Sequence, residues 1–171
     1  MTPTPTGRLL AAEQGRDLVL TRTYRAPADD VWASVTESDR TARWFGPWTG
    51  EPGPGRIIKV QMAFEDEQPW MDMTIDTCDP PRLLGISAVD DSGAWRLELE
   101  LTEIDGGTEL RFVHHLLTEA EIAQVSHVGP GWEYYLDMLG AARLGTPPPD
   151  FADYFPGMAA YYENLSPLTQ H

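Results

Sequence analysis

Residues 95–101 alternate between apolar and charged side chains more regularly than any other stretch of the chain. The apolar positions are Trp95, Leu97, Leu99 and Leu101, and the charged positions between them are Arg96, Glu98 and Glu100. Successive side chains of a strand point to opposite faces, so this pattern predicts a strand with one apolar and one polar face. Such a strand fits an antiparallel sheet that packs one face on a core and turns the other to water.

The same two-residue period recurs in neighbouring segments, and short turns separate them. Residues 56–64 and 70–77 each place apolar side chains, several of them methionine, on one face. Residues 82–89 form another strand, although the sequence does not show which of its faces is apolar. Asp105-Gly106-Gly107 predicts a tight hairpin before a last strand at residues 108–116, because glycine supplies the positive φ angles of such turns. Five consecutive strands with short turns predict an antiparallel meander.

The part of the chain before the meander predicts two further strands and two short helices. Residues 7–12 and 16–25 pair around a turn. Pro27 suits the first position of a helix, and the two acidic residues after Ala28 favour the positive end of its dipole. Ser38 then caps a second short helix.

The part of the chain after the meander is helical. Thr118-x-x-Glu121 is a capping-box pattern that opens a short helix. Pro130 is expected to begin the long helix, and Gly145 to end it. Residues 146–171 then form a helical extension, in which Pro156 begins the final helix.

Composition limits the classes of partner. With 171 residues, 42% of them hydrophobic, the sequence suits one globular domain over residues 1–171, with a frayed tail at residues 1–6. A formal net charge of -15 disfavours nucleic acid and anionic membranes as partners. No apolar run is long enough to span a membrane, and Cys78, the single cysteine, cannot form an internal disulfide. These observations favour a cytoplasmic protein and leave a homodimer open.

The apolar face of the predicted sheet needs a cover, and only the helix from Pro130 to Leu144 is long enough to supply one. That helix measures about 21 Å, whereas the strands reach about 30 Å, so the cover is expected to be incomplete. We therefore expect a concave space lined by soft methionine and aromatic side chains, which suit varied apolar ligands. From the residues alone, a filled core is the commoner arrangement.

The expected ligand contacts come from both the sheet and the helix. They are Trp48, Met62, Met71, Met73, Trp95, Leu97, Phe112, His114, Trp132, Tyr135 and Leu136. Trp44 and Trp48 flank the loop at the expected entrance, either as rim contacts or as structural plugs.

His114 is the most interesting polar residue, since strand alternation points it inward with Phe112. Its imidazole could bind a ligand hydroxyl or act as an acid or base. The alternative is a buried neutral histidine that is bonded to a backbone group or to water. His115 should face the other way, into solvent.

No metal or cofactor is expected. His114 and His115 are strand neighbours that point to opposite faces, so they cannot join His127 around one ion. The sequence also has no phosphate-binding loop and no nucleophile elbow. Cys78 has no evident base nearby and is interpreted as an inert thiol.

Three segments resemble the family named after the activator of the ninety-kilodalton heat-shock protein's ATPase, a branch of the START-like (SRPBCC) superfamily. They are PADDVWASVTESDRTARWFG at 27–46, GTELRFVHH at 107–115 and HVGPGWEYYLDML at 127–139. The resemblance, which runs from about Arg16 to Leu144, implies an α+β helix-grip fold. That fold is a curved antiparallel sheet of six or seven strands around a long C-terminal helix, with two short helices after the first strand. It also implies a hydrophobic cavity, which favours the concave space over a filled core.

Three functional hypotheses follow. The leading one is binding of a hydrophobic or aromatic small molecule, because the expected lining has almost no ionisable side chain. The second is a cyclase or dehydratase acting on a polyketide-like substrate, with His114 as acid or base and Tyr135 orienting the substrate. The third is a protein-interaction role in the stress response, similar to the co-chaperones. A chaperone partner is less favoured, because the eukaryotic co-chaperones carry an additional amino-terminal domain that this sequence does not show. Fold alone decides among none of them.

Overall fold

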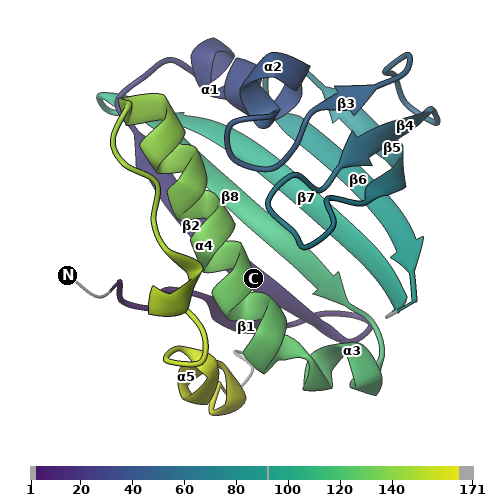
Figure 1. Ribbon diagram of the computed structural model, residues 1–171, viewed down its shortest axis with the longest axis vertical. Coiled ribbons are helices and arrows are strands. Elements are labelled where there is room, and N and C mark those ends of the chain that lie inside the picture. The colour runs from purple at the N-terminus through teal and green to yellow at the C-terminus, as the bar shows by residue number, and fades with distance from the viewer. Residues whose placement is uncertain (1–2, 92, 166–171) are drawn as a thin grey trace. The chain divides into compact units, whose positions relative to one another are not determined.

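The computed structural model describes residues 3–91 and 93–165 (Figure 1). The chain has an α+β helix-grip fold with an eight-stranded antiparallel sheet, in the order β1-β2-β8-β7-β6-β5-β4-β3, and a long helix, α4, that follows the sheet in sequence. The strands are β1 (Arg8–Ala11), β2 (Arg16–Tyr24), β3 (Trp48–Thr49), β4 (Ile57–Gln61), β5 (Trp70–Asp79), β6 (Leu83–Asp90), β7 (Gly93–Ile104) and β8 (Gly107–Leu116). The helices are α1 (Ala28–Thr36), α2 (Ser38–Thr41), α3 (Glu119–Ala123), α4 (Val125–Leu144) and α5 (Ala159–Glu163), with a single 3-10 turn at Phe151–Asp153.

The structure has one or two strands more than the six or seven expected. The strand that the sequence pattern misses is β3, which has only two residues, Trp48 and Thr49. Trp48 pairs with Val60 and Thr49 with Lys59. A strand this short offers no alternation for a pattern search to detect.

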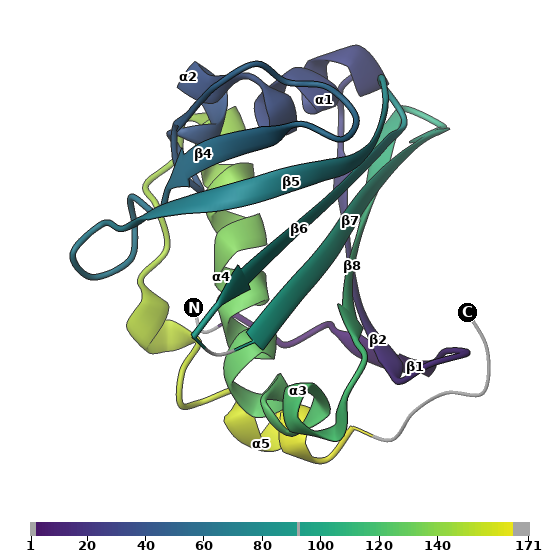
Figure 2. The same ribbon diagram turned by 90° about the vertical axis from the view of Figure 1, so that its right-hand side faces the viewer.

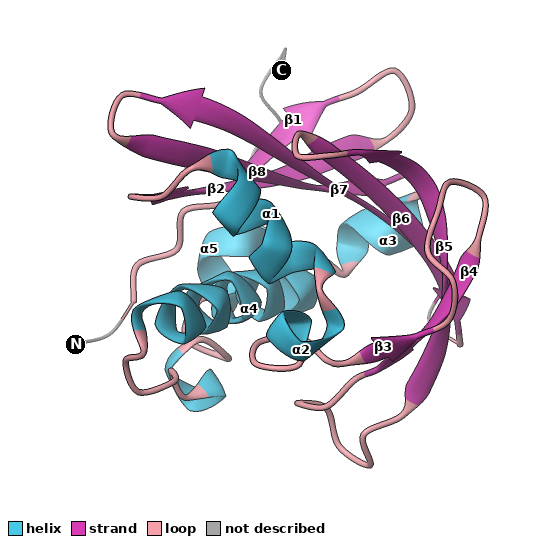
Figure 3. Cartoon of the chain, turned by 90° about the horizontal axis from the view of Figure 1, so that it is seen from above, coloured by secondary structure: helices cyan, strands magenta, loops and turns pink. Residues whose placement is uncertain are grey.

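The chain forms two compact units. The central unit is residues 22–112, and the terminal unit combines residues 1–21 with residues 113–171. Figure 3 shows α1, α2 and β3 to β7 in the central unit. The terminal unit contains β1, α4 and α5.

One face of the sheet in the central unit is apolar. Its buried centre consists of Ile58, Val60, Met73, Ile75 and Ala88. Cross-strand pairing places Ile58 opposite Met73, and such pairs stabilise a sheet through contacts on the same face. The predicted period-two segments are confirmed as strands over Ile57–Gln61, Trp70–Asp79 and Gly93–Ile104, and they contribute apolar side chains to one surface. The first strand is shorter than the predicted 56–64, so Phe64 lies in the loop after it and is 40% exposed.

A register irregularity lies in β5, between Ile75 and Thr77. The extra residue in β5 turns Cys78 toward the side of Ile75, so that Cys78 pairs with Leu84. The same phase continues along β6, where Ile86 lies opposite Leu97 of β7. The bulge breaks alternation within β5. The phase of β6 is hidden by its own adjacent apolar pairs, Leu83-Leu84 and Ala88-Val89.

The long helix begins earlier than predicted. Helix α4 starts at Val125 and has 20 residues, with Pro130 inside it rather than at its first position. Gln124 ends α3 and begins α4, so the capping-box helix leads directly into the long helix. Pro130 gives up one backbone hydrogen bond, but its ring is fully buried. At 1.5 Å per residue α4 is about 30 Å long, which exceeds the 21 Å expected. Strands of 10 to 12 residues reach about 33 to 40 Å, so the helix is still shorter than the longest strands.

The predicted start signal and the predicted end signal of this helical region are both confirmed. The Thr118 hydroxyl accepts a hydrogen bond from the Glu121 backbone N–H at 3.1 Å and donates one to the Glu121 carboxylate at 2.9 Å. Gly145 ends α4 in the left-handed conformation with φ 68°.

The C-terminal extension packs along α4 within the terminal unit. The ring of Tyr134 contacts Phe151 and Tyr154, and the Tyr154 hydroxyl donates a hydrogen bond to Asp137 at 2.7 Å. The last helix, α5, runs from Ala159 to Glu163, so the prediction that it begins at Pro156 is wrong. Residues 166–171, the end of the predicted extension, lie outside the described part of the chain.

Candidate functional site

Five of the predicted ligand contacts lie together on the apolar face of the central unit. Met73 belongs to its buried centre, and Trp48, Met62, Met71 and Trp95 pack against that centre while remaining only partly buried. We call this surface the methionine face; its remaining members are Ile58, Val60, Ile75, Ala88, Phe45, Cys78, Leu84 and Ile86.

Two other predicted contacts in the central unit are buried. Leu97 is 8% exposed and faces Ile86, which extends the methionine face toward β7. Phe112 on β8 is 4% exposed.

The methionine face holds no charged side chain. Its one titratable group is the partly buried thiol of Cys78. The other face of the same strands carries charged side chains beside the exposed Ile57 and Trp70, and there Lys59 of β4 forms an ion pair with Asp72 of β5 at 2.9 Å. Asp72 therefore points away from the methionines, as strand alternation requires.

Trp44 and Trp48 form hydrogen bonds to the end of helix α1 in the central unit. The Trp44 indole N–H donates to the Ser34 carbonyl at 2.9 Å, and the Trp48 indole N–H donates to the Thr36 carbonyl at 2.8 Å. Both carbonyls lie in the last turn of α1, where backbone acceptors have no partner within the helix. The two indoles therefore have a structural role, and Trp48 combines it with a place on the methionine face.

In the terminal unit, His114 is buried and bonded to an indole. It is 2% exposed, and the Trp132 indole N–H donates to His114 Nδ1 at 3.1 Å. The hydrogen-bond partner expected for a buried neutral histidine was a backbone group or water, and the indole of Trp132 is a partner that the sequence did not indicate. Sequence alone could not find it, because the two residues are 18 positions apart in different elements.

Burial controls the protonation of His114. Burial lowers its pKa from 6.5 to about 4; the nearby Glu121 carboxylate opposes this shift and His115 adds to it. The ring is therefore neutral at pH 7. Because Nδ1 accepts a hydrogen bond, the proton of the neutral ring resides on Nε2. A ring with this pKa is a weak base, and its chemistry at neutral pH is to donate a hydrogen bond.

The remaining predicted contacts of α4 are also buried. Tyr135 is 7% exposed, with its ring centre 6.0 Å from that of Trp132, and Leu136 is 2% exposed. Trp132, Tyr135 and His114 thus form one aromatic cluster inside the terminal unit.

Two polar clusters were not predicted. His115, expected to face solvent, has a side chain only 28% exposed, and its Nδ1 lies 2.7 Å from the buried Asp17 carboxylate. Glu133 of α4 is 1% exposed and has four hydrogen-bond donors around its carboxylate. The only sequence signal for Glu133 was an acidic residue inside an apolar helical stripe.

The donors to Glu133 come from both ends of the chain. The Thr6 backbone N–H donates at 2.6 Å and its hydroxyl at 2.9 Å, the Gly7 N–H donates at 3.2 Å, and the Tyr162 hydroxyl donates as well. Burial beside this carboxylate raises the pKa of Tyr162, which stays protonated. Thr6, assigned to a frayed tail by the sequence, is thereby fastened to α4.

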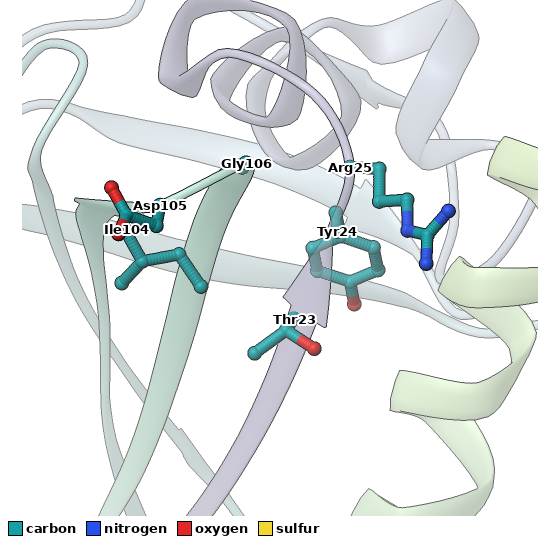
Figure 4. Close-up of a pocket in the computed structure, with 7 residues that line it drawn as sticks. Thr23, Tyr24, Arg25, Ile104, Asp105 and Gly106 are labelled. Carbon is teal, nitrogen blue, oxygen red and sulfur yellow. The ribbon is translucent and has the colours of Figure 1, made fainter.

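A hollow of about 610 Å³ lies elsewhere in the central unit, between the end of β2 and the β7–β8 hairpin. Figure 4 shows Ile104 and Asp105 on the hairpin and Tyr24 and Arg25 at the end of β2. Its lining contains one residue of each charge and none of the predicted ligand contacts. It is open to solvent and suits an apolar ligand poorly.

Two classes of site find no support in the described part of the chain. Within residues 3–91 and 93–165, no three His, Cys, Asp or Glu side chains are grouped so that they could hold a metal ion. None of the helices described there is long and apolar enough to cross a membrane.

Residues 25–142 match the model of the family described as activator of Hsp90 ATPase homolog 1-like protein. The chain belongs to this family. The match stops before the C-terminal extension and excludes both β1 and β2. No curated protein matches the chain.

Solved structures extend the similarity to the ends of the chain. CalU16 from Micromonospora echinospora is 27% identical with a TM-score of 0.75, over 95% of this chain and 96% of that one. The BPP1335 protein from Bordetella parapertussis is 23% identical with a TM-score of 0.74, over 99% and 95%. DynU16, a protein in the dynemicin biosynthetic locus, is 21% identical with a TM-score of 0.68, over 79% of this chain and 50% of that one. The last two show the fold alone.

Proposed function

We propose that this protein binds a hydrophobic or aromatic small molecule, and that the methionine face is its main contact surface. The observation that carries the proposal is incomplete burial: Trp48, Met62, Met71 and Trp95 pack on a buried centre but keep part of their apolar surface accessible. Removing apolar surface from water is favourable by about 25 cal/mol per Å². A ligand that covers these side chains gains that free energy.

The chemistry of the face indicates the class of ligand. It offers flexible thioethers and indole rings and no charged group, which suits apolar molecules of varied shape. A free carboxylate or ammonium on the ligand would lose its hydration there without gaining a partner. We therefore expect an uncharged ligand, or one that keeps its charged end in solvent.

Catalysis with His114 as a base finds less support. A general base works best when its pKa lies near the working pH, whereas burial holds the pKa of His114 at about 4. The place of DynU16 in a biosynthetic locus does not change this, because at 21% identity the likeness concerns the fold. Binding is the function that the side chains support better.

The first experiment is native mass spectrometry of freshly purified protein, followed by thermal-shift measurements with fatty acids, flavonoids and aromatic polyketides. We expect a co-purified apolar molecule, or a rise in melting temperature with at least one of these classes. Absence of both would contradict the proposal.

A matched pair of variants on β5 then locates the site. Met71 belongs to the methionine face, whereas its chain neighbour Trp70 is 53% exposed and lies outside that face. Met71→Ala should weaken binding about tenfold, because it removes a side chain worth about 1.5 kcal/mol of buried apolar contact. Trp70→Ala should leave the dissociation constant unchanged. Equal effects of the two substitutions would place the ligand elsewhere.

A further inference from the structure

The hairpin that joins β4 to β5 exposes large apolar side chains. Trp70 is 53% exposed, Phe64 40% and Ile57 61%, although side chains of this kind are usually covered. Figure 2 shows the connecting loop extending beyond the ends of both strands. We call Phe64, Trp70 and the exposed carboxylates of residues 65–67 the hairpin surface. Ile57 lies at the far end of β4, where it pairs with Thr74.

Strand register separates this surface from the methionine face. Ile57 pairs with Thr74, and Trp70 pairs with Gln61. The alternate positions of the same strands carry Ile58 and Met73, which are buried in the methionine face. Because successive strand residues point to opposite sides, Ile57 and Trp70 lie on the other side of the sheet. A ligand on the methionine face therefore does not cover them.

Backbone hydrogen bonds hold the loop in one conformation. The Met62 N–H donates to the Pro69 carbonyl at 2.7 Å, and the Gln68 N–H donates to the Glu65 carbonyl at 3.1 Å. The exposed side chains are thus presented by an ordered hairpin, which lowers the entropy that a partner must overcome on binding.

The charge of the loop indicates the partner. Glu65, Asp66 and Glu67 stand in sequence between Phe64 and Trp70, and all three are exposed. Within the described residues, Asp66 and Glu67 form no ion pair, whereas the nearby Asp72 is already paired with Lys59. An arginine side chain suits these exposed residue types, since its guanidinium can stack on an indole face and can donate hydrogen bonds to carboxylates.

We propose that the hairpin surface is a docking site for an arginine-containing basic segment of a partner protein. Stacking of guanidinium groups on Trp70 and Phe64 supplies the apolar contact, and the carboxylates of residues 65–67 supply the attraction. This role is independent of the small molecule proposed above, because Trp70 lies on the opposite side of β5 from the methionine face.

The test measures binding of a synthetic peptide of alternating arginine and alanine to the full chain by calorimetry. The control peptide carries citrulline in place of arginine, which keeps the shape and removes the charge. We expect the arginine peptide to bind at least tenfold more tightly than the citrulline peptide, and this difference to shrink at high salt. Equal affinity of the two peptides would overturn the proposal.

Variants then test which side chains of the hairpin surface bind the peptide. Trp70→Ala, and the double change Asp66→Asn with Glu67→Gln, should each weaken the arginine peptide at least fivefold. The controls Val89→Ala, at an apolar residue 80% exposed, and Glu98→Gln, at an exposed acidic position of β7, should leave affinity unchanged. Met71→Ala should also leave it unchanged, which separates this proposal from the small-molecule site. A full-affinity Trp70→Ala protein, or a self-association that Trp70→Ala abolishes, would overturn the assignment.

Discussion

The buried polar side chains of the terminal unit each have a hydrogen-bond partner that explains how they tolerate burial. His114 stays neutral and accepts a hydrogen bond from Trp132, whereas Glu133 has its carboxylate surrounded by four donors. Burying a polar group without a partner costs about 1 to 3 kcal/mol, so these partners decide whether the unit is stable.

Acid should weaken the fold through His114. The unfolded ring takes up a proton below its ordinary pKa of 6.5, while the folded ring stays neutral down to about pH 4. Between these values the unfolded state binds more protons, so the free energy of unfolding falls as the pH falls, by about 3 kcal/mol from this residue. Urea unfolding at neutral pH and near pH 4.5 should show a smaller acid-induced loss for His114→Gln than for the parent protein. His127→Gln, at an exposed ring, is the control and should behave as the parent; an unchanged loss in His114→Gln would contradict the argument.

Removal of the Glu133 carboxylate should destabilise the terminal unit. Glu133→Ala leaves buried donors of Thr6, Gly7 and Tyr162 without an acceptor, at an expected cost of about 3 kcal/mol. Glu163→Ala on α5 removes the same side chain from an exposed position and should change stability by less than about 0.5 kcal/mol. Chemical denaturation of both variants provides the comparison, and equal stabilities would contradict the role assigned to Glu133.

Residue-level features were the hardest to predict from the sequence. Strand alternation correctly placed His114 inside, yet its partner Trp132 and the pairing of Asp17 with His115 depend on which elements meet in space. Glu133 makes the same point, because three of its donors come from Thr6 and Gly7, 127 and 126 positions away. Local patterns carry no information about contacts of this range.

At the scale of elements, the sequence correctly predicted the features that depend on local backbone geometry. The capping box at Thr118, the glycine end of α4 at Gly145 and the meander of period-two strands are all confirmed. The errors arose where tertiary context overrides a local preference. Pro130 was expected to begin a helix but lies inside one, because its buried ring compensates for the hydrogen bond it cannot make.

Two glycines near the end of α4 should respond oppositely to alanine. Gly140 lies within the helix with open space around its Cβ position, so Gly140→Ala should stabilise the protein by about 0.5 to 1 kcal/mol. Gly145 has equally open space but a φ of 68°, so Gly145→Ala should destabilise by about 1 kcal/mol. Thermal unfolding of the two variants measures the difference. Shifts of the same sign would contradict the assignment of Gly145 as the helix end.

At the scale of the whole molecule, the chain combines the family's fold with segments that the family model does not cover. The fold class and the family could be predicted, because three segments carry the resemblance and the match extends over residues 25–142. The hydrogen bonds of Thr6 and Tyr162 to Glu133 of α4 could not be predicted, because Thr6 and Tyr162 lie outside the matched range and far from Glu133 in sequence. Strand alternation predicted the three methionines of the methionine face. Cys78 joins the same face only because of the bulge in β5.

The close packing of α5 on α4 also depends on a single small residue. A Cβ placed on Gly129 would lie 2.5 Å from the ring of Tyr162, which is closer than such atoms can approach. The terminal unit therefore requires glycine at this point of the helix, a constraint that no local pattern in the sequence reveals.

The most direct test of small-molecule binding is a nuclear magnetic resonance titration of protein labelled with carbon-13 at the methionine methyl groups. Met62, Met71 and Met73 report on the methionine face, and Met158, buried in the terminal unit, serves as an internal reference. With an apolar ligand found by thermal shift, we predict saturable changes in the three methyl signals of the face and little change at Met158. Saturating ligand that leaves Met62, Met71 and Met73 unperturbed would contradict the proposed site.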